Sequence, residues 1–254
     1  MFACLLLLFG FASRGEVAIR EEAPSPLDFA ADLSAYEEFM NPGQGEEYLV
    51  LVNRQHPIGR AEEPKDLTPL EGTRGDGRPA QKMRLCAAKA LDAMFLEMEA
   101  EGLLRATAPD GLAFSVTSGY RSYDYQAYLF DVYKNQYMAS GMTEAEARAR
   151  VCRTTAYPGE SEHHTGLAVD MHDRRSATAD FARSSTYAWL KANAWKFGFI
   201  LRYPEGKETV TGYSYEPWHY RFVGRFHAEA MHRSGECLEE YVERRQAQAL
   251  LLHD

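Results

Sequence analysis

The sequence predicts a single α+β domain in which helices pack around a central antiparallel sheet. Three observations lead to this prediction. Strand-like and helix-like segments are mixed along the chain, they do not alternate in a regular βαβ order, and no internal repeat interrupts them. A chain of 254 residues with 45% hydrophobic side chains is also the natural size for one domain with a full core.

Four segments have the composition of strands: 48–52, 114–118, 166–171 and 218–223. In the third, Leu167 and Val169 lie on an apolar face, while Asp170 lies on the opposite face among small residues. In the fourth, aromatic residues alternate with His219 and Arg221, which therefore share a face. An inward-facing carboxylate is costly unless it is paired or bound to a metal. The two strands therefore present polar groups that need a partner.

Four segments have helical patterns: 81–98, a helix that begins after Ser122, 144–153 and 185–197. The expected buried side of the first carries Met83, Ala87, Leu91, Met94 and Met98, and the apolar stripe of the second is Tyr125, Tyr128, Leu129, Val132 and Tyr133. Ser122 is a plausible N-cap, Thr143 and Glu146 form a capping box, and Gly198 ends the last helix.

Two short segments carry the residues of a metallopeptidase site. Residues 161–170 read SEHHTGLAVD, and residues 216–220 read EPWHY. Two imidazoles and one carboxylate, here His163, Asp170 and His219, are a common ligand set for catalytic zinc. Glu216 is well placed to take a proton from a metal-activated water, since Pro217 marks the strand entry and leaves Glu216 in the loop before it. The two segments together predict a site for one Zn²⁺ on the sheet.

Each residue also has a simpler interpretation. Asp170 could cap a turn, His163 could lie in a solvated loop, and His219 could be incidental to an aromatic core strand. Arg121 follows the predicted strand 114–118 in a turn, where it could bind a substrate carboxylate, stabilise an oxyanion, or form a surface salt bridge.

The order of three motifs is similar to that of the zinc-dependent D-alanyl-D-alanine carboxypeptidases of the VanY type. The motifs are SGYRS at 118–122 with Gln126, SEHHTGLAVD, and EPWHYRFVG at 216–224, and the resemblance covers roughly residues 45 to 230. The wider group includes D-Ala-D-Ala dipeptidases, lysostaphin-like endopeptidases and hedgehog domains.

The resemblance implies a role for each matched position. His163, Asp170 and His219 would bind zinc, Glu216 would activate the water and then protonate the leaving amine, and Arg121 would bind the scissile carbonyl or the terminal carboxylate.

The resemblance suggests further positions less directly. Gln126 and Ser161 match substrate-contacting positions, and Tyr203 is a candidate for the pocket wall. Spacing alone allows either His163 or His164 to bind the metal, and the family pattern favours His163. His172 is expected across the strand or in the next loop.

The implied function is removal of the C-terminal D-amino acid from peptidoglycan stem peptides. Three alternatives remain open: an L,D-carboxypeptidase, a D-Ala-D-Ala dipeptidase or endopeptidase, and a non-catalytic binding module stabilised by zinc. A base beside the metal weighs against the last. The net charge of −9 argues against nucleic-acid binding.

The remaining features concern domain organisation. Residues 1–20 resemble a secretory signal or anchor, although a basic n-region is missing, and a buried N-terminal strand or helix is the alternative. Residues 21–44 read as an acidic, proline-containing linker, 45–235 as the catalytic domain, and 236–254 as a helical tail. We expect a secreted or envelope-attached monomer, in which Cys152 and Cys237 could pair.

Overall fold

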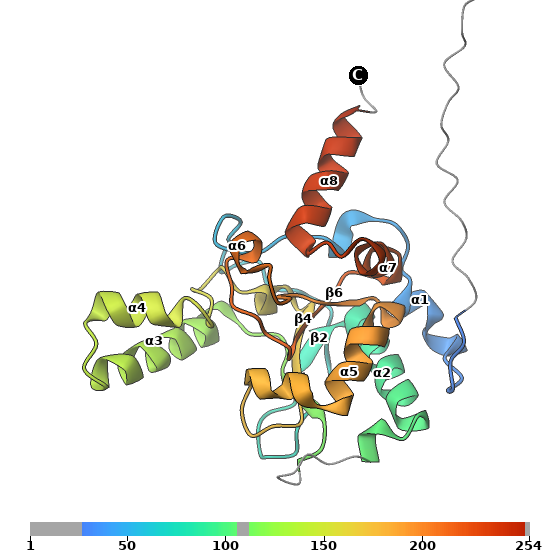
Figure 1. Ribbon diagram of the computed structural model, residues 1–254, viewed down its shortest axis with the longest axis horizontal. Coiled ribbons are helices and arrows are strands. Elements are labelled where there is room, and N and C mark those ends of the chain that lie inside the picture. The colour runs from blue at the N-terminus through green and yellow to red at the C-terminus, as the bar shows by residue number, and fades with distance from the viewer. Residues whose placement is uncertain (1–26, 106–111, 252–254) are drawn as a thin grey trace, which may run out of the picture.

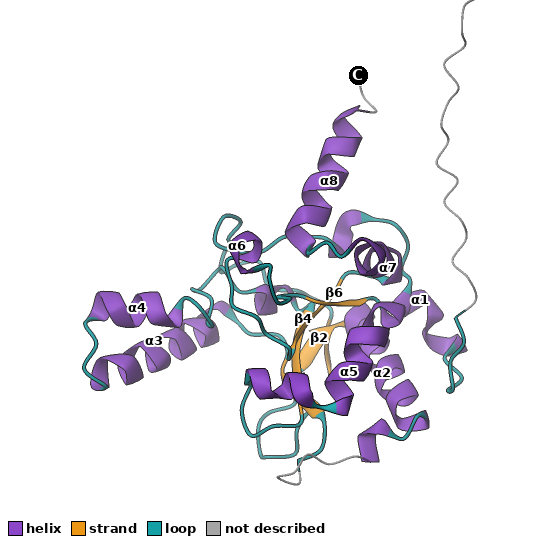
Figure 2. Cartoon of the chain, in the orientation of Figure 1, coloured by secondary structure: helices purple, strands orange, loops and turns teal. Residues whose placement is uncertain are grey.

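The central sheet of the molecule has four antiparallel strands in the order β3-β4-β6-β5. This computed structural model describes residues 27–105 and 112–251, so the predicted segment 1–20 lies outside the described residues. The sheet strands are β3 (Ser115–Ser118), β4 (Ala168–His172), β6 (His219–Phe222) and β5 (Phe199–Leu201). A separate hairpin pairs β1 (Leu67–Pro69) with β2 (Lys82–Arg84). The predicted α+β fold with an antiparallel sheet is confirmed (Figure 2).

Helices surround this sheet (Figure 1). The α-helices are α1 (Glu37–Met40), α2 (Leu85–Ala100), α3 (Tyr123–Ala139), α4 (Glu144–Val151), α5 (Ser185–Asn193), α6 (Glu208–Thr211), α7 (Arg225–Ser234) and α8 (Leu238–Leu251). Short 3-10 turns are η1 (Ser34–Tyr36), η2 (Glu46–Tyr48), η3 (Leu103–Arg105), η4 (Glu162–Thr165), η5 (Ala179–Arg183) and η6 (Ala194–Phe197). Helices α3 and α4 form a hairpin that projects from the body, and α8 projects from another side.

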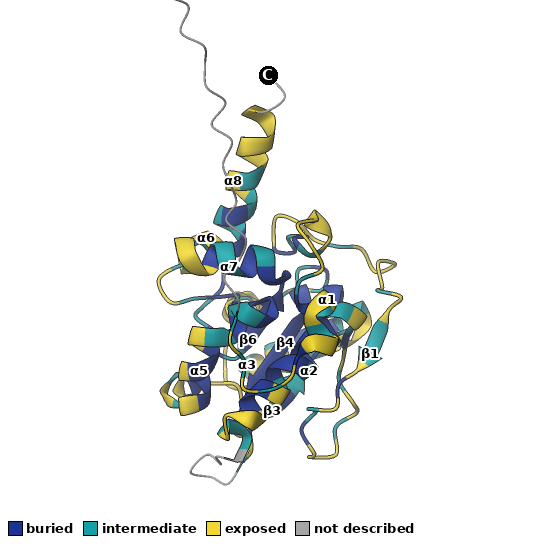
Figure 3. Ribbon diagram, turned by 90° about the vertical axis from the view of Figure 1, so that its right-hand side faces the viewer, coloured by how far each residue is buried: buried dark blue, intermediate teal, exposed yellow. Residues whose placement is uncertain are grey.

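One face of the sheet is buried against α2 and α5. The five residues of the first predicted buried side are all buried, Met83 in β2 and the others in α2, and they join Val169, Tyr220 and Phe222 in one hydrophobic cluster. Figure 3 shows this centre as a continuous buried region between the sheet and the helices. Because side chains alternate across a strand, the opposite face carries Asp170 and His219, and it is this face that holds the candidate site.

Several local predictions are confirmed. The Ser122 hydroxyl accepts a hydrogen bond from the Tyr125 backbone at the start of α3, and Thr143 and Glu146 form the predicted capping box of α4. Gly198 adopts a left-handed conformation (φ 82°) and ends the segment formed by α5 and η6.

The predicted strand 48–52 and the start of the first predicted helix are wrong. Residues 46–48 form a 3-10 turn, and the carbonyls of Tyr48 and Val50 accept hydrogen bonds from the Arg221 side chain at 2.9 Å instead of joining a ladder. Residues 82–84 form β2, so the helix begins at Leu85.

The predicted apolar stripe of α3 lies mostly outside the core. The buried side chains of this helix are Gln126 and Phe130, whereas Tyr125 and Tyr128 are 51% and 63% exposed. Helix α3 packs mainly on the small helix α4, and its tyrosine face stays open.

The segments outside the predicted catalytic domain also contact it. In the described part of the predicted linker, Leu33 and Met40 are buried in the main hydrophobic cluster. At the other end, Leu238 and Tyr241 of α8 are buried in a second cluster. The three described cysteines, Cys86, Cys152 and Cys237, are free thiols, so the pairing considered for two of them is absent. Within 27–105 and 112–251, every helix is too short or too polar to cross a membrane.

Candidate metal centre and active-site cleft

The strand register sets the first two site residues side by side. Asp170 of β4 pairs directly with His219 of β6, and Ser118 of β3 pairs with Asp170 on the other side after a register shift. Residues paired across antiparallel strands project to the same face with short Cβ separations. His219 Nδ1 accordingly lies 3.1 Å from Asp170 Oδ1.

The third residue comes from the turn that leads into β4. His163 lies in η4, which ends at Gly166 in a left-handed conformation (φ 65°) that lets the chain turn into the strand. His163 Nδ1 lies 2.7 Å from the carbonyl oxygen of Gly119, where it can donate a hydrogen bond. The opposite ring atom, Nε2, then faces Asp170 Oδ2 at 3.3 Å.

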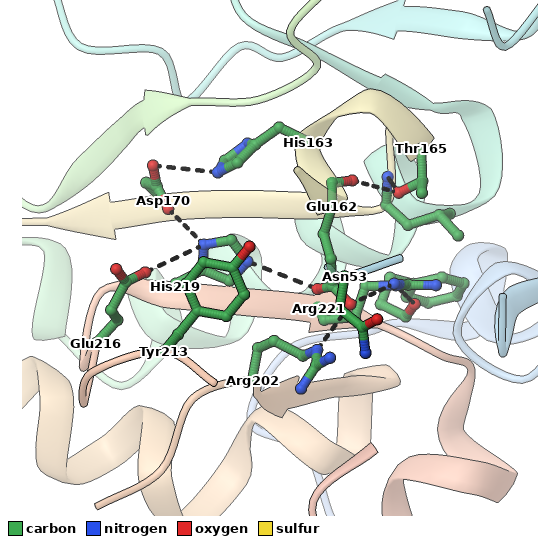
Figure 4. Close-up of polar contacts among 12 residues, drawn as sticks. Asn53, Glu162, His163, Thr165, Asp170, Arg202, Tyr213, Glu216, His219 and Arg221 are labelled. Carbon is green, nitrogen blue, oxygen red and sulfur yellow. Dashed lines mark hydrogen bonds and ion pairs between the residues drawn. The ribbon is translucent and has the colours of Figure 1, made fainter. Parts of the chain in front are cut away.

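His163, Asp170 and His219 together form a buried set of ligand atoms (Figure 4). One ligand atom from each residue lies within 4.8 Å of the others. Among the described residues, His163 Nε2 and Asp170 Oδ1 find no hydrogen-bond partner, which is costly for buried polar atoms. Nitrogen and carboxylate donors in this number suit zinc, so the residues present fit this metal.

The charge states of two members of the set suit metal binding. Burial opposes ionisation of Asp170, but His163 and His219 outweigh it and hold the pKa of this carboxyl well below its usual range. Burial lowers the pKa of His163 to about 4, so this imidazole is neutral and can act as a ligand near pH 7.

The neighbouring histidines are engaged elsewhere. His164 Nδ1 lies 2.7 Å from the carbonyl oxygen of Arg121, and His164 Nε2 accepts a hydrogen bond from the Gly159 backbone at 3.1 Å. His172 Nδ1 accepts from the Arg174 backbone at 3.2 Å. Both residues are outside the metal-binding group found among the described residues.

Glu216 lies beside the candidate metal site. Its Oε2 is 3.6 Å from His219 Nδ1, and Pro217 follows it just before β6. Burial raises the pKa of the Glu216 carboxyl to about 8. A carboxyl group with a pKa near neutrality can both accept and return a proton, which is the property of a general acid–base.

Arg121 reaches the same site from the loop between β3 and α3. Its guanidinium contacts Asp170 Oδ2 at 3.0 Å, and it also donates to Ser118 Oγ at 2.9 Å and to Gln126 Oε1 at 3.0 Å. Gln126 is fully buried and its amide donates to the carbonyl of Ala156. The Gln126 side chain therefore holds Arg121 in place from behind, and its expected contact with substrate stays a prediction.

These residues open onto a cleft of about 1160 Å³. The predicted contacts Ser161 and Tyr203 line it, together with Tyr213 and Trp218. The cleft continues along α3, where Tyr125, Leu129 and Tyr133 form part of its wall. The cleft therefore extends well beyond the candidate metal ligands.

A buried cluster of charged side chains beside the site was not predicted from the sequence. Glu162 Oε1 accepts hydrogen bonds from Arg202 Nε at 2.7 Å and Arg221 Nη1 at 2.9 Å, and Arg202 also pairs with Glu239 of α8. Arg221 inside the aromatic strand β6 and Arg202 directly after β5 were the only indication in the sequence, because the partners lie far apart along the chain.

Comparison with known proteins identifies relatives of the chain. A family model described as VanY, D-alanyl-D-alanine carboxypeptidase, matches residues 82–225. A D-alanyl-D-alanine carboxypeptidase of Enterococcus faecalis is 39% identical over 206 residues, which cover 78% of this chain and 68% of the relative.

Two solved structures are similar in both sequence and fold. A mutant of the VanY D,D-pentapeptidase in complex with Zn(II) is 37% identical with a TM-score of 0.61, covering 77% of this chain and 98% of that one. The LdcB LD-carboxypeptidase is 36% identical with a TM-score of 0.65, covering 78% of this chain and 86% of that one.

Proposed function

The chain belongs to the VanY family of D-alanyl-D-alanine carboxypeptidases, and on this premise we propose that it is a zinc peptidase of peptidoglycan metabolism. Its proposed reaction is hydrolysis of the terminal peptide bond of stem peptides that end in D-Ala-D-Ala. The observation that carries the proposal is the buried set of His163, Asp170 and His219, with Glu216 next to it in an open cleft.

In the proposed reaction, the protein residues hold the metal and move one proton. His163 Nε2, Asp170 and His219 Nδ1 would hold a single zinc ion. Zinc supplies Lewis acidity and lowers the pKa of water towards neutrality. Glu216 accepts a proton from the attacking water at its carboxylate and delivers it to the nitrogen of the departing D-alanine.

Arg121 provides the positive charge that the substrate needs. Its position, fixed by Ser118 and Gln126, supports binding of the terminal carboxylate or of the scissile carbonyl. A cation in this place gives an anionic peptide a local positive charge in a protein whose net charge is −9.

The proposed substrate, peptidoglycan, suggests where the protein acts. We propose that the protein acts outside the cytoplasm, as a monomer whose N-terminal segment serves for export or attachment. Residues 45–235 would form the catalytic domain.

An L,D-carboxypeptidase is the second candidate, because the LD-carboxypeptidase LdcB is among the similar structures. Both activities would use the same metal and base, and they differ in whether the residue before the scissile bond is a D- or an L-amino acid. The shape of the cleft around that residue decides between them.

Replacement of the base tests the mechanism. Glu216→Gln should keep its zinc and lose D-alanine release from a pentapeptide by about 10²–10⁴-fold, the usual contribution of a general acid–base. The exposed Glu205→Gln serves as a control that should keep full turnover. Full turnover in the zinc-loaded Glu216→Gln protein would remove Glu216 from the reaction.

A further inference from the structure

Two buried polar atoms without hydrogen-bond partners among the described residues face each other behind the metal site. They are Glu162 Oε2 and His219 Nε2, which lie 3.7 Å apart. His219 Nε2 is the ring atom opposite Nδ1, the atom that faces Asp170 and Glu216. Glu162 thus lies on the far side of the imidazole from the candidate metal position (Figure 4).

The carboxylate of Glu162 is fixed in this orientation by its other oxygen. Oε1 accepts both arginine hydrogen bonds, from Arg202 and Arg221, and the Glu162 side chain is completely buried. A carboxylate held by two guanidinium groups on one oxygen cannot turn freely, so the second oxygen stays directed at His219.

The two arginines are anchored independently of Glu162. Arg202 Nη1 and Nη2 donate to Glu239 at 2.8 and 2.6 Å, and Arg221 Nη2 donates to the carbonyls of Tyr48 and Val50. Two arginines and two glutamates leave the cluster electrically balanced. Stability alone would be served by any group that accepts these hydrogen bonds, but only a carboxylate also offers a second acceptor atom to the imidazole.

On the basis of the proposed zinc site, we propose that Glu162 is a positioning residue that accepts the Nε2 proton of His219. This contact fixes the tautomer of His219 so that the Nδ1 lone pair points to the metal. Hydrogen bonding of a ligand imidazole to a carboxylate also makes it a better donor. For His163, the carbonyl oxygen of Gly119 plays the same part by accepting from Nδ1. The two histidines are therefore oriented by different kinds of acceptor, a backbone carbonyl and a carboxylate.

Zinc affinity of the metal-free protein, measured by chelator competition, tests this role. In Glu162→Gln the side-chain oxygen can still accept from the arginines, but the amide then presents N–H groups to His219 Nε2. We expect zinc affinity to fall by about 10–100-fold, the usual cost of losing such a contact. Glu239→Gln is the matched control, because it perturbs the same Arg202 but does not touch His219. This variant should bind zinc as the wild type does, even if it is less stable.

A second measurement uses the wild-type protein, so it is independent of whether the variants fold. In the zinc-loaded wild type labelled with ¹⁵N-histidine, the Nε2 proton of His219 should give a downfield signal in slow exchange with water. Unchanged zinc affinity in Glu162→Gln, equal losses in both variants, or absence of that protected proton would overturn the inference. A wild-type protein that binds no zinc would instead contradict the proposed function.

Discussion

At the scale of single residues, the sequence was sufficient to name the candidate ligands but not to distinguish His163 from His164 by physical reasoning. Spacing allowed either histidine, and only the family pattern favoured the first. The folded chain separates them, because backbone groups of Gly159 and Arg121 occupy both nitrogens of His164. Both partners lie outside the segment 161–170 that contains the two histidines, so that segment alone could not reveal them. The ligand assignment itself remains a prediction.

Substitution of each histidine by alanine tests this assignment. His163→Ala should abolish zinc binding and activity, because it removes a ligand atom from a set of three. His164→Ala should retain most of both but lose about 1–3 kcal/mol of stability, since two backbone groups lose their partner. Metal content and denaturant unfolding of the two variants check this, and normal zinc in His163→Ala would refute it.

At the scale of elements, patterns determined by neighbouring residues were predicted well. The alternation in β4 and β6 and the caps at Ser122 and Thr143 depend on local geometry, and the structure confirms them. The segment 48–52 has strand-like side chains, but its carbonyls bind Arg221 from a distant strand. Helix α3 has the predicted apolar pattern, of which Tyr125, Leu129 and Tyr133 line the cleft. In the segment 48–52 a tertiary contact overrode the local pattern.

The buried residue His227 of α7 should make the stability of the protein depend on pH. This buried imidazole lies 2.8 Å from the Tyr241 hydroxyl of α8 and 3.2 Å from the carbonyl oxygen of Gly45, and burial lowers the pKa of His227 below its usual value. The unfolded chain takes up a proton near pH 6.5 that the folded protein resists, so the free energy of unfolding should decrease as the pH falls below about 6.5.

The comparison of variants isolates this contribution. In metal-free protein, His227→Gln should show a weaker loss of stability between pH 6.5 and 5 than the wild type in denaturant unfolding. His232→Gln, an exposed position on the same helix, should retain most of the wild-type loss. Equal pH dependence in the wild type and His227→Gln would contradict this explanation.

At the scale of the whole molecule, the site depends on segments that are far apart in the sequence. Arg121 arrives from the loop before α3, His163 from η4, His219 from β6, and the supporting Glu239 from α8. The sequence motifs identify the candidate ligands and the base because histidines and carboxylates occur together in two short segments. The residues that hold them, such as Gln126 and Glu162, are ordinary in type, and only the assembled fold shows what they contact.

The most direct test of the account is product analysis by mass spectrometry on defined stem peptides. Purified protein, either zinc-loaded or stripped by a chelator, is incubated with a pentapeptide ending in D-Ala-D-Ala and with the corresponding tetrapeptide. The account predicts loss of one D-alanine from the pentapeptide, no activity in the stripped protein, and recovery on addition of zinc. Cleavage of the tetrapeptide alone would assign the L,D-carboxypeptidase activity. Hydrolysis of free D-Ala-D-Ala, tested as a third substrate, with neither stem peptide cut would assign the dipeptidase activity. Cleavage of neither peptide by the zinc-loaded protein, or full activity without zinc, would contradict the central claim.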